Sequence, residues 1–118
     1  MPIERLQPGP RMSQAVIHNK TVYLAGQVAD EAAGKGVAEQ TRDILSTIDA
    51  LLAQAKTDKT RILSATIWLT SMSTFGEMNK VWDQWVAPGS TPARATVESA
   101  KLAGAQYKIE ISMIAAQP

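Results

Sequence analysis

Apolar and polar residues alternate with a period of two over residues 12–18, which predicts a first β-strand. Residues 21–29 are rich in β-branched and aromatic side chains and predict a second strand. A tight turn is predicted between them at residues 18–20, because Asn19 tolerates the left-handed conformation that such turns need. Gly26 interrupts the second strand, since a glycine inside a strand often marks a bulge or a close backbone approach.

From Val37 onward the spacing of apolar residues changes to that of a helix. Apolar or small residues recur every three or four positions, and charged residues occupy the positions between them. This spacing predicts an amphipathic helix that buries one face. The predicted buried stripe consists of Val37, Thr41, Ile44, Leu45, Ile48, Leu51, Leu52 and Ala55.

The second half of the chain predicts three more strands and one more helix. Thr74 and Glu77 have the spacing of a capping box, which predicts the start of the helix. Pro88 ends that helix, because proline cannot continue the hydrogen-bond ladder. Residues 93–99 and 107–115 predict two strands joined by a short hairpin. Residues 61–70 predict a strand with Leu63, Ala65, Ile67 and Leu69 on one face and Ile62, Ser64, Thr66 and Trp68 on the other.

The order of elements is ββαβαββ, with a further extended segment expected near residues 3–6. Two helices and four or more strands predict a two-layer α+β sandwich with the helices on one face. The 118 residues suit a single domain, residues 1–118. Both faces of the predicted strands are rather apolar, so we expect the outer sheet face to be buried in an oligomer.

The composition excludes several kinds of chemistry. Cysteine is absent, which excludes disulfides, thiolate metal sites and a cysteine nucleophile. His18 is the only histidine, too few for common catalytic metal sites, so no metal is expected. The net charge of +1 lacks the basic excess of nucleic-acid binders, although a local basic patch stays open. No apolar run could span a membrane and no signal-peptide core is present, so we expect a cytoplasmic protein.

Arg94 is the first candidate for the remaining chemistry. It lies near the start of a predicted strand, after a proline-fixed entry. A guanidinium can bind a carboxylate through two parallel hydrogen bonds and so fix its orientation. The spacing alone favours a solvated strand arginine, paired with Glu98, because most charged residues are of that kind.

Glu110 is the second candidate. It alternates with Ile109 and Ile111 on the last predicted strand, and burial of its face in an interface would suit its carboxyl to proton transfer. The same alternation describes an ordinary outward carboxylate, and periodicity does not separate the two interpretations.

The chain resembles the RidA (YjgF) family of enamine/imine deaminases over nearly its whole length. The motifs that carry the resemblance are Gly9-Pro10, Ala25-Gly26-Gln27, Phe75 with Asn79 and, above all, residues 92–98 followed by residues 107–111. Residues 78–83 are more similar to the YoaB-like branch than to the archetypal deaminase. The resemblance implies a chorismate-mutase-like fold, assembled as a homotrimer with clefts between subunits.

The resemblance also implies cofactor-free hydrolysis of reactive 2-enamines and 2-imines, such as 2-aminoacrylate, to 2-oxo acids and ammonia. Arg94 would hold the substrate carboxylate and Glu110 would position or activate the water. Gly26, Thr96 and Asn79 would line the same pocket. An imine carbon is already electrophilic, so orientation and one acid–base group could supply most of the rate.

Three residues that the resemblance places at the substrate-binding pocket depart from the archetype. Ala25 stands where the archetype has a serine, and Arg11 where it has a pocket tyrosine. Thr96 replaces a cysteine, which would preserve a backbone contact. These departures keep open a second interpretation, a non-catalytic trimer that binds small carboxylates as a metabolite sensor or regulator. A third interpretation, ribonuclease action, fits poorly with the balanced charge and the single His18.

Overall fold

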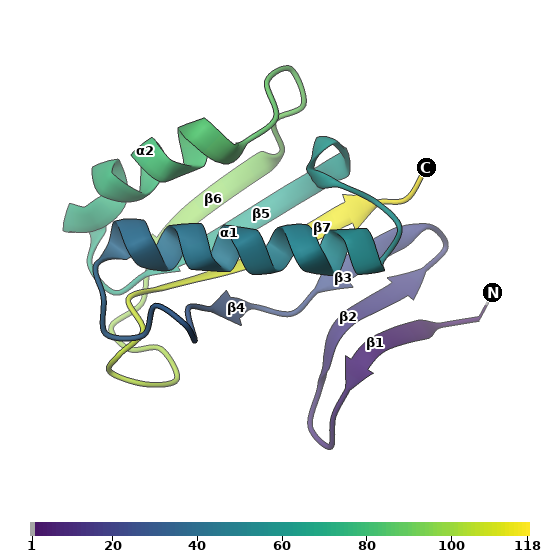
Figure 1. Cartoon of the computed structure of the whole chain (residues 1–118), viewed down its shortest axis with the longest axis horizontal. Helices are drawn as coiled ribbons and strands as arrows, with labels where there is room; N and C mark the ends of the chain where they lie inside the picture. Colours follow the sequence, from purple (N-terminus) through teal and green to yellow (C-terminus); the bar gives the residue numbers. More distant parts are fainter. Residues whose placement is uncertain (1) are drawn as a thin grey trace.

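The computed structural model describes residues 2–118, which form one mixed β-sheet with two helices on one of its faces (Figure 1). This arrangement confirms the two-layer α+β sandwich. The helices are α1 (Val37–Gln54) and α2 (Phe75–Trp85), with single 3₁₀ turns at Lys59–Arg61 and Met72–Thr74. The strands are β1 (Glu4–Pro8), β2 (Ser13–His18), β3 (Thr21–Leu24), β4 (Gln27–Val28), β5 (Ile62–Leu69), β6 (Ala93–Glu98) and β7 (Ile109–Ala116).

The strands follow the order β1-β2-β3-β7-β5-β6, and β4 pairs with β7 beyond the end of β3. All neighbours are antiparallel except β5 and β6, which are parallel. The expected hairpin between the last two strands is therefore wrong, because β5 lies between β6 and β7. A parallel pair needs a long crossover, and α2 supplies it between β5 and β6. This crossover places α2 directly beside β6.

The apolar stripe predicted for α1 is confirmed, since all eight of its residues are buried. They pack on the inner face of the sheet, where Ile67, Ile109 and Ile111 have no solvent exposure. Burial of each large aliphatic side chain contributes about 1.5–3 kcal/mol. This layer fixes which face of each strand meets the helices. None of the helices within residues 2–118 is long and apolar enough to cross a lipid bilayer.

The face predicted for the start of β5 is wrong at two residues. Ile62 is buried and Leu63 is 52% exposed, the reverse of the predicted alternation. The pairing of β5 with β7 shifts register between Ile62 and Ser64. A β-bulge inserts one extra residue and so reverses the alternation on its far side. From Ala65 onward the predicted faces hold.

The ends of the helices and strands depend on specific local contacts. Asn19 and Lys20 have φ values of 51° and 61°, which confirms the tight turn between β2 and β3. The predicted capping box is wrong: the Thr74 hydroxyl donates to the carbonyl of Ser71 instead. The carboxylate of Glu77 accepts a hydrogen bond from the N–H of Ala38 at 3.0 Å and so caps α1. Glu77 thereby connects the two helices.

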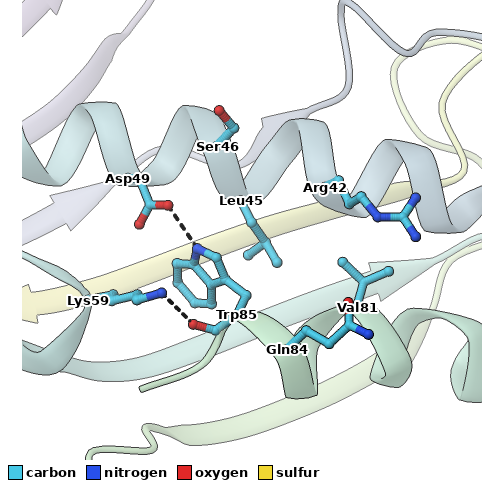
Figure 2. A pocket seen from close by; sticks show the side chains of 8 residues that line it. All are labelled: Arg42, Leu45, Ser46, Asp49, Lys59, Val81, Gln84 and Trp85. Carbon is cyan, nitrogen blue, oxygen red and sulfur yellow. Dashed lines mark hydrogen bonds between the residues drawn. The ribbon is translucent and has the colours of Figure 1, made fainter. Parts of the chain in front are cut away.

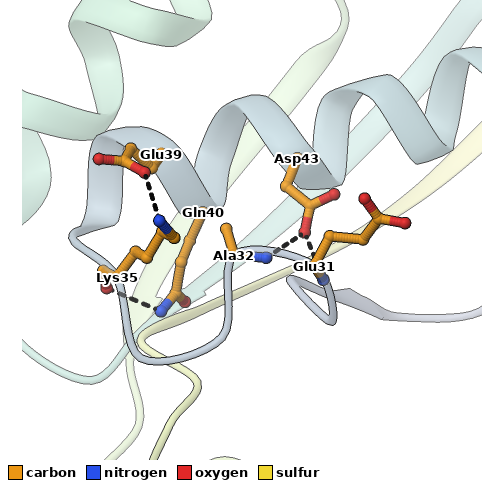
Figure 3. Close-up of polar contacts among 6 residues, drawn as sticks. All are labelled: Glu31, Ala32, Lys35, Glu39, Gln40 and Asp43. Carbon is orange, nitrogen blue, oxygen red and sulfur yellow. Dashed lines mark hydrogen bonds and ion pairs between the residues drawn. The ribbon is translucent and has the colours of Figure 1, made fainter.

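The segment before α1 is held by polar side chains of α1 itself (Figure 3). The carboxylate of Asp43 accepts hydrogen bonds from the N–H groups of Glu31 and Ala32. The fully buried amide of Gln40 donates to the carbonyls of Lys35 and Gln106 and accepts from the N–H of Lys108. Gln40 therefore fixes the entry into β7, the strand that carries Glu110.

Candidate functional site

Arg94 lies on the inner face of β6, where α2 covers it. It is paired with the buried Ala65 of β5, and its side chain lies against the helix. Its Nη1 donates to the amide oxygen of Asn79 at 2.8 Å. Its guanidinium carbon lies 5.2 Å from the ring centre of Trp82 and 5.7 Å from that of Phe75. The structure thus joins the predicted residues Arg94 and Asn79 and adds two aromatic rings.

The charge of Arg94 is not neutralised within residues 2–118. The alternative of a pair with Glu98 is wrong, because the Glu98 carboxylate accepts from the N–H of Met72 at 2.7 Å. Only Nη1 of Arg94 donates hydrogen bonds within the described residues. The Nε and Nη2 donors therefore remain for a ligand, and these two can bind a carboxylate bidentately.

Thr96 lies two residues from Arg94 on the same face of β6, opposite Ile67. Its hydroxyl oxygen is buried and has no hydrogen-bond partner within residues 2–118. A covered hydroxyl does not reach a ligand at the surface. The predicted binding role of Thr96 therefore depends on its backbone groups.

Glu110 lies on the other face of the sheet, the face that no helix covers. Ile109 and Ile111 on either side of it are fully buried against the helices, so the alternation of β7 turns Glu110 outward. It is paired with Trp68 of β5 and Val28 of β4. Its carboxylate lies over Gly26: a Cβ at that position would be 2.1 Å from Oε2. The structure thus joins the predicted residues Glu110 and Gly26.

Ala25 and Arg11 lie in the connections between strands. The N–H of Ala25 donates to the carbonyl of Gln14, and its carbonyl accepts from the side chain of Gln27. Gln27 is buried and also donates to the side chain of Gln14 at 2.9 Å, which fixes the backbone beside Gly26. Arg11 is exposed between β1 and β2 and makes no hydrogen bond or ion pair within the described residues.

One copy of the chain does not bring Arg94 and Glu110 to the same ligand. They lie on opposite faces of the sheet, with β5 between their strands. Two strand spacings alone separate them by about 10 Å, before their opposite directions are counted. The resemblance implied one pocket in a cleft between subunits and left open whether one chain or two supply these residues; within a single chain they lie on separate faces of the sheet.

A groove of about 310 Å³ lies between α1 and α2 (Figure 2). Trp85 forms its wall, and its indole N–H donates to the carboxylate of Asp49 at 2.9 Å. The ammonium of Lys59 donates to the backbone carbonyl of Trp85 at 2.6 Å and lies 5.1 Å from the centre of its ring. These polar contacts hold the end of α2 against α1 and against the 3₁₀ turn at Lys59–Arg61. The groove is therefore part of the packing interface between the two helices. It contains neither Arg94 nor Glu110.

The aromatic contacts of Arg94 are the part of the site that sequence reasoning missed. Trp82 is only 5% exposed and so belongs to the core. However, Phe75, Asn79 and Trp82 have i, i+4, i+7 spacing and so share one face of the helix. A basic residue on the strand beside that face was the signal that could have identified these contacts.

Comparison with known proteins identifies the class of protein that has this fold. The Endoribonuclease L-PSP family matches residues 2–117. The RutC family protein YoaB of Escherichia coli is 42% identical over 116 residues, which cover 98% of this chain and 99% of that protein. A 2-iminobutanoate/2-iminopropanoate deaminase of Bos taurus is 36% identical over 110 residues, which cover 89% of this chain and 79% of that protein.

The crystal structure of a YjgF family member from Neisseria meningitidis matches with a TM-score of 0.96 and 43% identity, covering 100% of this chain and 97% of that one. The chain therefore belongs to the RidA/YjgF family, also described as the L-PSP or RutC family. The expected similarity to the YoaB-like branch is confirmed. The family includes imine deaminases, which are the more distant relatives of this chain.

Proposed function

We propose that this protein hydrolyses 2-imino acids, and the 2-enamines that tautomerise to them, to 2-oxo acids and ammonia. The observation that carries the proposal is the guanidinium of Arg94, which lies against α2 with two donors unused and no carboxylate partner within residues 2–118. Such a group suits a ligand carboxylate. The named activity of the bovine relative agrees with this substrate class.

In the proposed reaction, Arg94 holds the carboxylate of the 2-imino acid. The carboxylate of Glu110 accepts a proton from water while the water oxygen forms a bond to the imine carbon. The C=N electron pair moves to nitrogen, which takes up this proton from Glu110. Glu110 then carries the hydroxyl proton of the carbinolamine to its amino nitrogen, the C–N bond breaks, ammonia leaves and the C=O bond of the 2-oxo acid forms. General acid–base assistance of this kind contributes about 10²- to 10⁴-fold.

We further propose that the site forms between two copies of the chain in a homotrimer. Arg94 and Glu110 occupy opposite faces of one sheet, so a second copy must supply one of them. The outer face offers apolar surface for such an interface: Tyr23 is 46% and Val97 43% exposed. An exposed apolar face of this kind is typical of a surface that another subunit covers.

The activity is tested with a 2-imino acid generated in situ by an amino-acid oxidase. Semicarbazide traps the free imine as an absorbing product, so an active deaminase lowers the trapping rate. We expect Arg94→Ala to raise KM and Glu110→Gln to lower kcat. Absence of any acceleration by the native protein over imines of several amino acids would refute the deaminase function.

Co-expression of the two impaired variants, assayed at a substrate concentration below the native KM, tests the divided site. In a mixed trimer, an Arg94→Ala subunit retains Glu110 and a Glu110→Gln subunit retains Arg94. Random assembly then restores about one site in four, so about a quarter of the native activity should return. If both residues act within one chain, co-expression restores nothing.

A carboxylate-binding trimer without turnover is the second candidate. The observation in its favour is Ala25, which offers no hydroxyl beside Gly26 and Glu110. Calorimetry with pyruvate together with the trapping assay separates the candidates, because a sensor binds the 2-oxo acid and leaves the rate of imine trapping unchanged.

A further inference from the structure

The guanidinium of Arg94 has an unusual environment for a charge. Its neighbours are two aromatic faces, the amide oxygen of Asn79 and the sulfur of Met78, which is 4.0 Å from Nη1. Met78 and Trp82 are buried, whereas Phe75 is 37% exposed. The more buried ring thus lies beneath the charge, and the less buried ring lies towards solvent.

These contacts restrict both the plane and the direction of the guanidinium. A cation within about 6 Å of a ring centre is attracted to the negative face of the ring. The bond from Nη1 to Asn79 fixes rotation within that plane. The two contacts together leave the edge formed by Nε and Nη2 without a partner within residues 2–118. No contact with a carboxylate lowers the positive charge on that edge.

We propose that Trp82 is a positioning residue for carboxylate recognition, acting through Arg94. Its indole holds the guanidinium flat, so that the edge formed by Nε and Nη2 is presented to a monocarboxylate in the orientation that two parallel hydrogen bonds require. The inference rests on the proposed function for the identity of the ligand, a small 2-oxo or 2-imino acid. It does not require turnover.

Substitution of Trp82 should weaken carboxylate binding and leave the chemical step intact. Losing the orientation that this partly desolvated cation–π contact gives to Arg94 corresponds to about tenfold in affinity. We expect Trp82→Leu to raise the Kd for pyruvate, and KM if the protein turns over, about tenfold at unchanged kcat. Trp82→Phe retains a ring face and should recover most of the affinity. If Trp82 only filled the core, its substitution would lower stability and leave the Kd and the KM unchanged.

The matched control is Trp85→Phe on the same helix. Trp85 contacts Asp49 and Lys59 and packs at a tilt on Trp82, with 5.6 Å between the ring centres, but it makes no hydrogen bond or cation–π contact with Arg94 within residues 2–118. The phenyl ring of Trp85→Phe keeps an aromatic face against Trp82, so we expect native affinity for pyruvate. A tenfold loss in this control as well would show that the effect arises from the helix as a whole, and would overturn the inference.

Tryptophan fluorescence tests the contact without altering Trp82. Replacing Trp68 and Trp85 by Phe leaves Trp82 as the only indole of the chain. In this background we expect Arg94→Met to change the emission of the free protein, and pyruvate to change it with the Kd measured by calorimetry. An emission that does not respond to Arg94→Met would overturn the inference even if the protein is an active deaminase.

The outcomes of the two proposals are distinguishable. Pyruvate binding that depends on Trp82, without imine hydrolysis, refutes the deaminase and supports the positioning role. Hydrolysis whose KM is unchanged in Trp82→Leu supports the deaminase and overturns the positioning role. If pyruvate does not bind the native protein at all, the carboxylate role of Arg94 fails and the inference fails with it.

Discussion

Replacement of Gly26 by alanine should abolish most activity without weakening the fold. The added Cβ would lie 2.1 Å from Oε2 of Glu110 and 2.9 Å from its Cδ. Both atoms belong to the flexible end of a side chain, so the carboxylate can rotate away at low cost. The φ of Gly26 is not positive, so alanine fits the backbone there. Alanine also reduces the entropy of the unfolded chain, and stability should remain equal or rise by about 0.4–1 kcal/mol.

The size of the activity loss follows from the displacement. Ordinary contact begins at 3.4 Å, so the carboxylate must move by about 1.3 Å, and a misplacement of about 1 Å can cost about a hundredfold in rate. We therefore expect kcat for a 2-imino acid to fall about a hundredfold, which is about 2.7 kcal/mol in activation free energy. KM should change little, because Arg94 holds the substrate carboxylate and the added methyl group contacts only Glu110.

The assay compares four variants by steady-state kinetics and thermal denaturation. Gly76→Ala is the matched control, because a Cβ at Gly76 in α2 meets no atom within 4 Å. The double variant of Gly26→Ala with Glu110→Gln should be no slower than Glu110→Gln alone, since both substitutions disable the same carboxylate, that of Glu110. Native kcat in Gly26→Ala, or a full additive loss in the double variant, would refute the role assigned to Glu110.

Three further predictions concern stability. Leu52→Ala removes a fully buried side chain of α1 and should lower the free energy of unfolding by about 2–5 kcal/mol, measured by urea denaturation with an unchanged m-value. The hydrogen bond from Tyr107 to Asp30 raises the pKa of Tyr107, so the stability that this bond gives is present below the ordinary tyrosine pKa and is lost as the pH rises through the pKa of the folded state. The fall in Tm at alkaline pH should therefore be smaller in Tyr107→Phe than in the native protein, and the same fall in both would contradict this. The hydroxyl of Thr60 donates to Asp58 and lowers its pKa, so this stabilisation is present at neutral pH and is lost below about pH 4. The Tm difference between the native protein and Asp58→Asn should therefore narrow on acidification, and a constant difference would refute it.

The helices, the strands and the two layers were predictable because each depends on the spacing or the type of residues that are close in sequence. The stripe of α1 and the turn at Asn19 are of this kind. The reversed face at Leu63 was not predictable, because a bulge is defined by the partner strand. Glu77 caps α1 instead of its own helix for the same reason: the choice depends on which helix end lies nearby in space.

Sequence reasoning identified the residues of the candidate site but not their division between two faces. The short loop before residues 107–111 suggested a hairpin, and a hairpin would have placed β6 beside β7. Strand order is a long-range property. The crossover through α2 places β6 on the side of β5 that faces away from β7, and no local pattern encodes this choice. The aromatic contacts of Arg94 were hidden for a similar reason, since Trp82 satisfies the pattern of a core residue while it also contacts the charge.

The parallel pairing of β5 with β6 has a consequence for the evolution of ligand preference in this protein. Arg94 and its contacts belong to a contiguous β5-α2-β6 unit, whereas Gly26 and Glu110 belong to the region of the antiparallel strands β4 and β7. Substitutions that alter ligand preference can therefore accumulate in the first unit while the second keeps its chemistry. A chimaera that exchanges residues 62–98 between two relatives should transfer the preference for a ligand and leave the reaction type with the host.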